Sequence, residues 1–188
     1  MTISKSLIEH NTGTTGGGVL SSGAVLDIGK STIRHNPATG IGIGIGIGIG
    51  GGLAVTDGPV YLRRSSVSEN TANQAGGIQN QGQMVVEDSK VDGNSANLGG
   101  GAVVILGNMV VRHSRFDENQ ALTGFGGGLV NAGGSNLALT DVDVTRNIAN
   151  MPAGGVHNSG TVTTNGRIRI TDNAPTNRAP TVVPNCFG

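Results

Sequence analysis

The chain has 188 residues, including 34 glycines, and its 12 basic and 12 acidic side chains give a formal net charge of zero. This length corresponds to about one domain. A neutral chain lacks the basic surplus that binding to phosphate backbones requires, so nucleic acid is not expected as a partner. No stretch approaches about 18 consecutive apolar residues, so membrane insertion is not expected either.

Few residues of the chain point to a signal peptide, a disulfide or a metal site. The segment 1–6 lacks the basic start and the apolar run of a signal peptide. Cys186 is the only cysteine, which excludes an internal disulfide and a cysteine metal site. His10 and His35 are too few for a structural zinc site. We therefore expect no metal and no cofactor.

One asparagine per repeat punctuates the whole chain, at intervals of 25, 34, 24, 25, 28 and 26 residues. The seven positions are Asn11, Asn36, Asn70, Asn94, Asn119, Asn147 and Asn173. A glycine cluster that runs into an apolar residue follows each of the first six, as in Gly18-Val19 and Gly155-Val156. A fixed period of this length is the signature of stacked repeats, none of which can bury its apolar face alone.

Each repeat has the pattern of one coil of short strands. In the unit that ends at Asn94, the patterning predicts strands over 77–80, 83–87 and 89–92, separated by glycine and asparagine turns. Three strands and three turns make one triangular coil. The sequence therefore predicts an all-β fold: a right-handed parallel β-helix of about seven coils of about 25 residues, over residues 1–174. Its hand follows the general rule for parallel crossovers.

Like residues recur at fixed distances from the asparagines and are expected to stack about one strand spacing (~4.8 Å) apart. A serine column stands five positions before, and an alanine column two after; both are expected to keep the coil narrow. The asparagines are expected to form a turn ladder, because Asn tolerates left-handed backbone and its amide can bond the same amide one coil away. Three positions before the asparagines stands the predicted core ladder: Ile8, Ile33, Val67, Val91, Phe116, Val144 and Ile170.

Three regions depart from the period. The interval from Asn36 to Asn70 contains a Gly-Ile alternation at about 40–50, which predicts either a lengthened strand or a loop that bulges from the rod. The segment 175–188 contains prolines, which cannot donate to a ladder, and is expected to be a C-terminal cap. The first coil has no comparable cap. We expect it to be covered by a segment absent here or to pair with another chain.

The outward positions carry the only candidates for chemistry. Asp88, His113 and Asp141 occupy equivalent places in successive coils, and opposite signs on neighbouring coils predict a solvated, ion-paired face. A catalytic alternative remains, because the two aspartates stand two coils apart, roughly 9.6 Å by strand spacing. That separation is near the range of an inverting glycosidase pair. Long loops that would form a cleft are missing, and aromatic platforms for sugars are scarce.

The repeated Gly-Gly-apolar elements and the run Phe116-Asp117-Glu118-Asn119 resemble the GGA(I,L,V) and FxxN motifs of polymorphic outer membrane protein repeats. The run 89–96 is similar to coils of secreted bacterial right-handed parallel β-helix repeat proteins. The resemblance covers roughly residues 1–175. It implies a secreted or cell-surface module, structural or adhesive, with no catalytic residue.

This function is the leading prediction, with a surface polysaccharide or a host protein as partner. Two alternatives stay open. One is a carbohydrate-active enzyme, a hydrolase or lyase, that acts through Asp88, His113 and Asp141 on an outer strand face. The other is a filament subunit that self-associates through its first coil.

Overall fold

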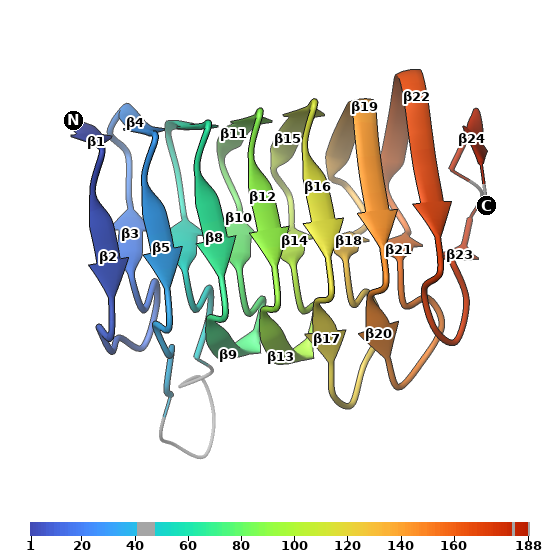
Figure 1. Cartoon of the computed structure of the whole chain (residues 1–188), viewed down its shortest axis with the longest axis horizontal. Helices are drawn as coiled ribbons and strands as arrows, with labels where there is room; N and C mark the ends of the chain where they lie inside the picture. Colours follow the sequence, from blue (N-terminus) through green and yellow to red (C-terminus); the bar gives the residue numbers. More distant parts are fainter. Residues whose placement is uncertain (41–47, 182, 188) are drawn as a thin grey trace.

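The computed structural model describes residues 1–40, 48–181 and 183–187, so residues 41–47 of the Gly-Ile insertion expected at about 40–50 lie outside them. Within the described residues, all regular structure is β-strand and every strand pairing is parallel. The strands wind into a rod in which the chain runs down the front wall and returns behind it as it advances from the N-terminus to the C-terminus (Figure 1). This is a right-handed parallel β-helix, and the predicted fold is confirmed.

Each coil is built from four wall segments. Wall A holds the first segment of each coil: β1 (Thr2–Ser4), β4 (Leu26–Gly29), β7 (Pro59–Arg63), β11 (Gln83–Glu87) and β15 (Asn108–Arg112). Wall B follows after a corner: β2 (Leu7–Glu9), β5 (Thr32–Arg34), β8 (Ser66–Ser68), β12 (Lys90–Asp92) and β16 (Arg115–Asp117). The long strands β19 (Asn136–Thr145) and β22 (Thr161–Thr171) run through both walls, and β24 (Cys186–Phe187) pairs with β22.

The other two walls close the coil. Wall C is short: β9 (Thr71–Gln74), β13 (Ser95–Leu98), β17 (Gln120–Ala121) and β20 (Ile148–Ala149). Wall D is the return wall: β3 (Val19–Ser21), β6 (Leu53–Val55), β10 (Ile78–Asn80), β14 (Ala102–Val104), β18 (Leu129–Asn131), β21 (Val156–Asn158) and β23 (Arg178–Pro180). Its seven strands give the predicted seven coils. The expectation of three strands per coil is wrong for the four coils that carry a strand in wall C, because that wall, with its small and polar residues, carries no apolar alternation.

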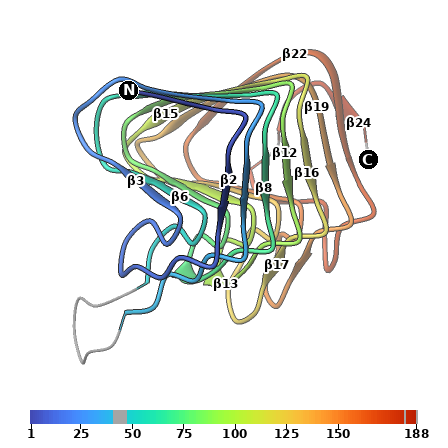
Figure 2. The same ribbon diagram turned by 60° about the vertical axis from the view of Figure 1, so that its left-hand side comes forward.

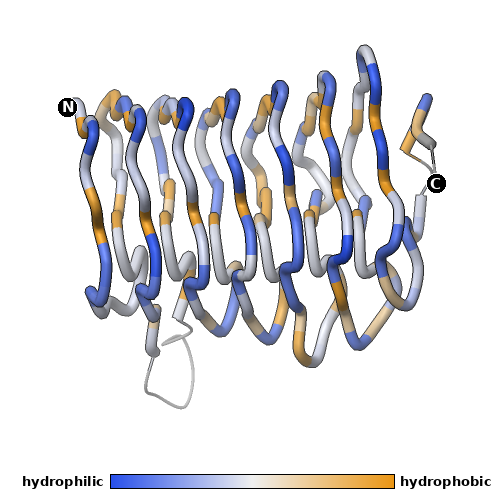
Figure 3. Tube along the Cα trace, viewed as in Figure 1, coloured by the Kyte–Doolittle hydropathy of each residue, from blue (hydrophilic) through white to orange (hydrophobic). Residues whose placement is uncertain are grey.

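One narrow core fills the rod. The walls enclose a single interior when the rod is seen more nearly along its axis (Figure 2). Apolar positions recur at the same height in successive coils (Figure 3). Val91 pairs in register with Val67 on one side and Phe116 on the other. All three are fully buried, as are Ile33, Val144 and Ile170, whereas Ile8 in the first coil is partly buried.

The asparagines form the predicted ladder. Asn70 Nδ2 donates to Asn94 Oδ1 at 3.0 Å and to the Ile33 carbonyl at 3.0 Å, and the same Asn94 oxygen accepts the Asn70 backbone N–H. The ladder runs beyond Asn173, because Asn177 Oδ1 accepts both N–H groups of Asn173 at 3.1 Å. The segment expected as a cap thus carries the ladder one step further, and its strand β23 extends wall D.

The left-handed bend lies one residue earlier than expected. The residue before each ladder asparagine, such as His35 (φ 53°) or Glu69 (φ 56°), adopts positive φ, and the ladder asparagines do not. The residue before each serine of the corner between walls A and B does the same. At both corners the bend falls on an outward-facing residue, which leaves the next side chain directed into the coil for hydrogen bonding.

No helix in the described residues is long and apolar enough to span a membrane.

Candidate binding groove

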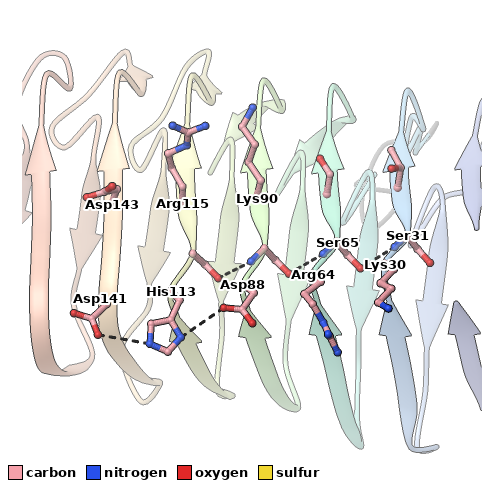
Figure 4. A pocket seen from close by; sticks show the side chains of 14 residues that line it. Lys30, Ser31, Arg64, Ser65, Asp88, Lys90, His113, Arg115, Asp141 and Asp143 are labelled. Carbon is pink, nitrogen blue, oxygen red and sulfur yellow. Dashed lines mark hydrogen bonds and ion pairs between the residues drawn. The ribbon is translucent and has the colours of Figure 1, made fainter. Parts of the chain in front are cut away.

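A groove of about 910 Å³ runs along the corner between walls A and B. We call it the corner groove. One side is the corner row, the left-handed residues Lys30, Arg64, Asp88, His113 and Asp141. The other side is the strand row, which holds the first residue of four wall B strands and the residue of β19 that pairs in register with Arg115. Its members are Thr32, Ser66, Lys90, Arg115 and Asp143. Figure 4 shows the two rows facing outward across five successive coils.

A serine ladder forms the floor. Ser65 Oγ accepts the backbone N–H of Ser31 at 3.0 Å, and Ser89 Oγ accepts that of Ser65 at 3.1 Å. Each hydroxyl donates to the carbonyl two residues earlier, as Ser89 does to Glu87 at 2.7 Å. These serines are nearly fully buried, at 3 to 7% exposure. They hold consecutive coils at one spacing, so the outward rows beside them are also in register.

The groove arises from corner geometry and not from loops. Long loops that would form a deep cleft are missing from the sequence, and the groove is correspondingly open to solvent. A residue with positive φ turns its side chain outward, the next serine points in, and the following residue points out again. Stacking that triplet over four coils, with Asp141-Val142-Asp143 in the fifth, produces two rows of outward side chains with the groove between them.

Charge changes along the groove. Lys30 and Arg64 stand at its N-terminal end, opposite the small hydroxyl residues Thr32 and Ser66. Asp141 and Asp143 close its C-terminal end, so that end carries two carboxylates in one coil.

The remaining strand-row cations have partners on their own wall. Lys90 Nζ lies 2.8 Å from Asp92 Oδ2, and Arg115 Nε lies 3.8 Å from Asp117 Oδ2. Among the described residues, no ion pair involves Lys30 or Arg64. The N-terminal end of the groove is therefore its uncompensated cationic part.

The three residues proposed from the sequence lie side by side in the corner row. His113 Nδ1 is 3.6 Å from Asp88 Oδ1, and His113 Nε2 is 3.6 Å from Asp141 Oδ2. All three side chains are about half exposed. The imidazole occupies the space between the two carboxylates (Figure 4). The arrangement leaves no open gap between the two aspartates.

Asp141 is the most firmly held of the three. The backbone N–H of Arg167 donates to its Oδ1 at 2.8 Å. Thr140 pairs with Asn165 and Val142 with Ile168, so Asp141 lies opposite two residues, Gly166 and Arg167, in a β-bulge. A Cβ on Gly166 would lie 2.3 Å from Asp141 Oδ1. The glycine, with φ of +66°, provides the space for this carboxylate.

Other outward-facing charged residues and histidines lie outside the corner groove. Arg63 bridges Asp27 at 2.8 Å and Glu87 at 3.5 Å on wall A, which is the type of ion ladder that the alternating signs predict. His10 and His35 stack with ring centroids 5.3 Å apart at the asparagine corner. Within the described part of the chain, no group of three or more His, Cys, Asp or Glu residues is arranged to hold a metal ion.

Sequence reasoning missed most of the groove. Lys30, Lys90, Arg115 and Asp143 were not identified, although the first three stand directly beside a serine of the column and Asp143 stands beside Val142, which takes the same column position. The signal was available in the triplet of polar, serine, polar residues. Comparisons with protein-family models, with curated proteins and with solved structures find no match.

Proposed function

We propose that this chain is a non-catalytic, structural or adhesive β-solenoid module that binds a polysaccharide along the corner groove. The observation that carries the proposal is the lining: all 14 residues that line the groove are polar or charged, and they come from five consecutive coils. Such a straight, open, polar groove fits an extended chain rich in hydroxyl groups. The coil spacing of ~4.8 Å is close to the length of one sugar ring along its chain.

The lining disfavours a protein partner. Protein interfaces depend on buried aromatic and apolar anchors at their centre, and no apolar or aromatic side chain lines this groove. A sugar polymer can instead hydrogen-bond to hydroxyl, ammonium, guanidinium and carboxylate groups. A secreted or cell-surface location belongs to the same proposal and is supported by the resemblance of the Gly-Gly-apolar and Phe116–Asn119 motifs to polymorphic outer membrane protein repeats.

The test is a binding screen of the whole chain against polysaccharides, by affinity electrophoresis followed by calorimetry. Ser66→Trp places an indole in the groove, whereas Thr163→Trp places one at an exposed strand position on wall A, away from it. We expect Ser66→Trp to weaken binding at least about tenfold by blocking a concave site, with Thr163→Trp unchanged. Failure of every polymer to bind, or equal effects of the two substitutions, contradicts the proposal.

A second candidate is a carbohydrate-active enzyme that uses Asp88, His113 and Asp141. The contacts that favour it are the imidazole held between two carboxylates and the fixed position of Asp141 over Gly166. The contact that opposes it is the same imidazole, which fills the place where an inverting pair would hold the sugar and water. We rank it below the binding module for that reason.

The enzyme candidate has its own test. The chain is incubated with neutral and acidic polysaccharides, and new reducing ends or unsaturated products are measured. Asp141→Asn is the matched variant, because its amide oxygen can still accept the Arg167 N–H while the carboxylate charge is removed. Turnover that disappears in Asp141→Asn supports an enzyme, whereas no turnover with any polymer contradicts it.

A further inference from the structure

We infer that the N-terminal end of the corner groove is an anion subsite, formed by Lys30 and Arg64 with the hydroxyls of Thr32 and Ser66, that selects acidic polysaccharides. The inference rests on the proposed function, because it names the class of polymer that the groove takes. The shared ligand chemistry is a carboxylate or sulfate group on a sugar chain.

The two cations are placed for one ligand. Ser31 and Ser65 are joined by a ladder hydrogen bond, and Thr32 pairs in register with Ser66. Lys30 and Arg64 therefore stand at equivalent places on adjacent coils, about 4.8 Å apart in backbone. Both have positive φ, 53° and 49°, at the outward bend. An anionic group above the serine floor can accept from both cations, and such charged hydrogen bonds are the strong ones.

Lys30 and Arg64 are available to an anionic ligand. Both side chains are exposed, and neither is in an ion pair within the described residues. The adjacent Arg63, by contrast, is paired with Asp27 and Glu87 on wall A. Lys5 continues the same corner row one coil earlier, also with positive φ. Lys5, Lys30 and Arg64 are therefore three consecutive cations of the corner row, with Asp88 as the first carboxylate beyond them, and such a run suits a polyanion.

The other end of the groove gives the ligand a direction. Asp141 and Asp143 present two carboxylates in one coil, and they repel an anion that reaches them. The best ligand therefore places acidic sugars at Lys30 and Arg64 and neutral sugars at the aspartates. Removing one of those carboxylates has the opposite effect on acidic polymers from removing a cation.

The experiment compares polygalacturonate for carboxylate, dextran sulfate for sulfate and dextran as the neutral polymer, by calorimetry at two ionic strengths. The double variant Lys30→Ala with Arg64→Ala is expected to weaken acidic polymers about tenfold or more. It should weaken neutral dextran much less, because dextran loses only uncharged hydrogen-bond acceptance and no charge pairing. Asp143→Asn is expected to strengthen acidic polymers a few-fold. Arg112→Ala is the matched control, because Arg112 is an exposed arginine that does not line the groove.

The outcomes separate this inference from the proposed function. One outcome overturns the anion subsite alone. In it, Ser66→Trp abolishes binding, dextran binds as tightly as the acidic polymers, and the double variant Lys30→Ala with Arg64→Ala binds as the wild type does. An equal loss in Arg112→Ala also overturns it, because bulk charge would then be responsible. A single-stranded oligonucleotide that binds as tightly as the acidic polysaccharides overturns the choice of polymer. No groove-dependent binding of any polymer overturns both proposals.

Discussion

Asn119 Oδ1 accepts two hydrogen bonds from Asn94, one from its Nδ2 at 3.0 Å and one from its backbone N–H at 3.1 Å. Asn119 Nδ2 in turn donates to Asn147 Oδ1 at 2.9 Å and to the Val91 carbonyl at 3.0 Å. Both Asn94 and Asn119 are fully buried, so water cannot replace these bonds. One side chain thus satisfies polar groups on the coil before it and the coil after it.

Replacing Asn119 by alanine is expected to destabilise the chain by about 3 to 5 kcal/mol. The variant leaves the buried backbone N–H of Asn94 and one N–H of its side-chain amide without an acceptor, and each such group costs about 1 to 3 kcal/mol. Urea denaturation measures the change. Asn97→Ala is the control, because the Asn97 side chain forms an exposed bond to Asn73 at 2.8 Å. It should change the free energy of unfolding by no more than about 0.5 kcal/mol, and a similar loss in both variants would contradict the role of the ladder.

The coil could be predicted because each repeat imposes the same restraints on the same columns. The apolar residue three before each asparagine, such as Val91, and the asparagine itself both recur without exception, and both are buried in the five coils between the first and the last. Wall C could not be predicted in this way. Strands β9 and β13 hold residues such as Asn73 and Gln74, which have no strand preference of their own. They become strands because the coils above and below offer ladder hydrogen bonds.

The site was predicted only in part for a similar reason. Asp88, His113 and Asp141 were found as outward charges in one column, and the structure brings them together. Lys30 and Arg64 were not identified as a site, because their role depends on a left-handed corner. Lysine and arginine seldom adopt positive φ on their own. The serine ladder on the following residues holds them there, and that ladder becomes visible only once the coils are stacked.

Replacing glycine by alanine is expected to change the free energy of unfolding in opposite directions at two positions. A Cβ on Gly101 would lie 2.3 Å from the Gly128 carbonyl oxygen on the next coil, whereas a Cβ on Gly29 would meet nothing within 4 Å. Gly101→Ala is expected to lower the free energy of unfolding by about 1 to 3 kcal/mol, as overpacking does. Gly29→Ala is expected to raise it by about 0.4 to 1 kcal/mol, because it restricts the unfolded chain.

Thermal melts of these two glycine variants measure both changes. Opposite signs are the expected result. Two shifts of the same sign would show that the close approach of the glycine corners does not limit the side chain at this position.

Phe116 is the largest fully buried side chain, in register between Val91 and Val144. Phe116→Ala is expected to cost about 3 to 5 kcal/mol, because the cavity cannot collapse where both neighbouring coils are fixed by ladders. Chemical denaturation measures the loss. Leu106→Ala is the control at a side chain that is 76% exposed, and it should cost no more than about 0.5 kcal/mol. A small loss in Phe116→Ala would show that the core column does not stabilise the rod.

The burial of the His157 imidazole predicts how the free energy of unfolding depends on pH. Its ring stacks on Phe125 with centroids 3.6 Å apart, and burial lowers the pKa of the imidazole from its ordinary 6.5. The unfolded chain therefore binds this proton at a higher pH than the folded one, so stability falls as pH drops through about 6.5. His157→Gln removes the titrating group and should flatten the fall in unfolding free energy between pH 8 and pH 5. The difference between the two proteins at pH 8 measures the contacts of the neutral ring, which are its stacking on Phe125 and its 3.4 Å contact with Ser159 Oγ. Parallel pH profiles of the wild type and the variant would show that the proton on this ring does not contribute.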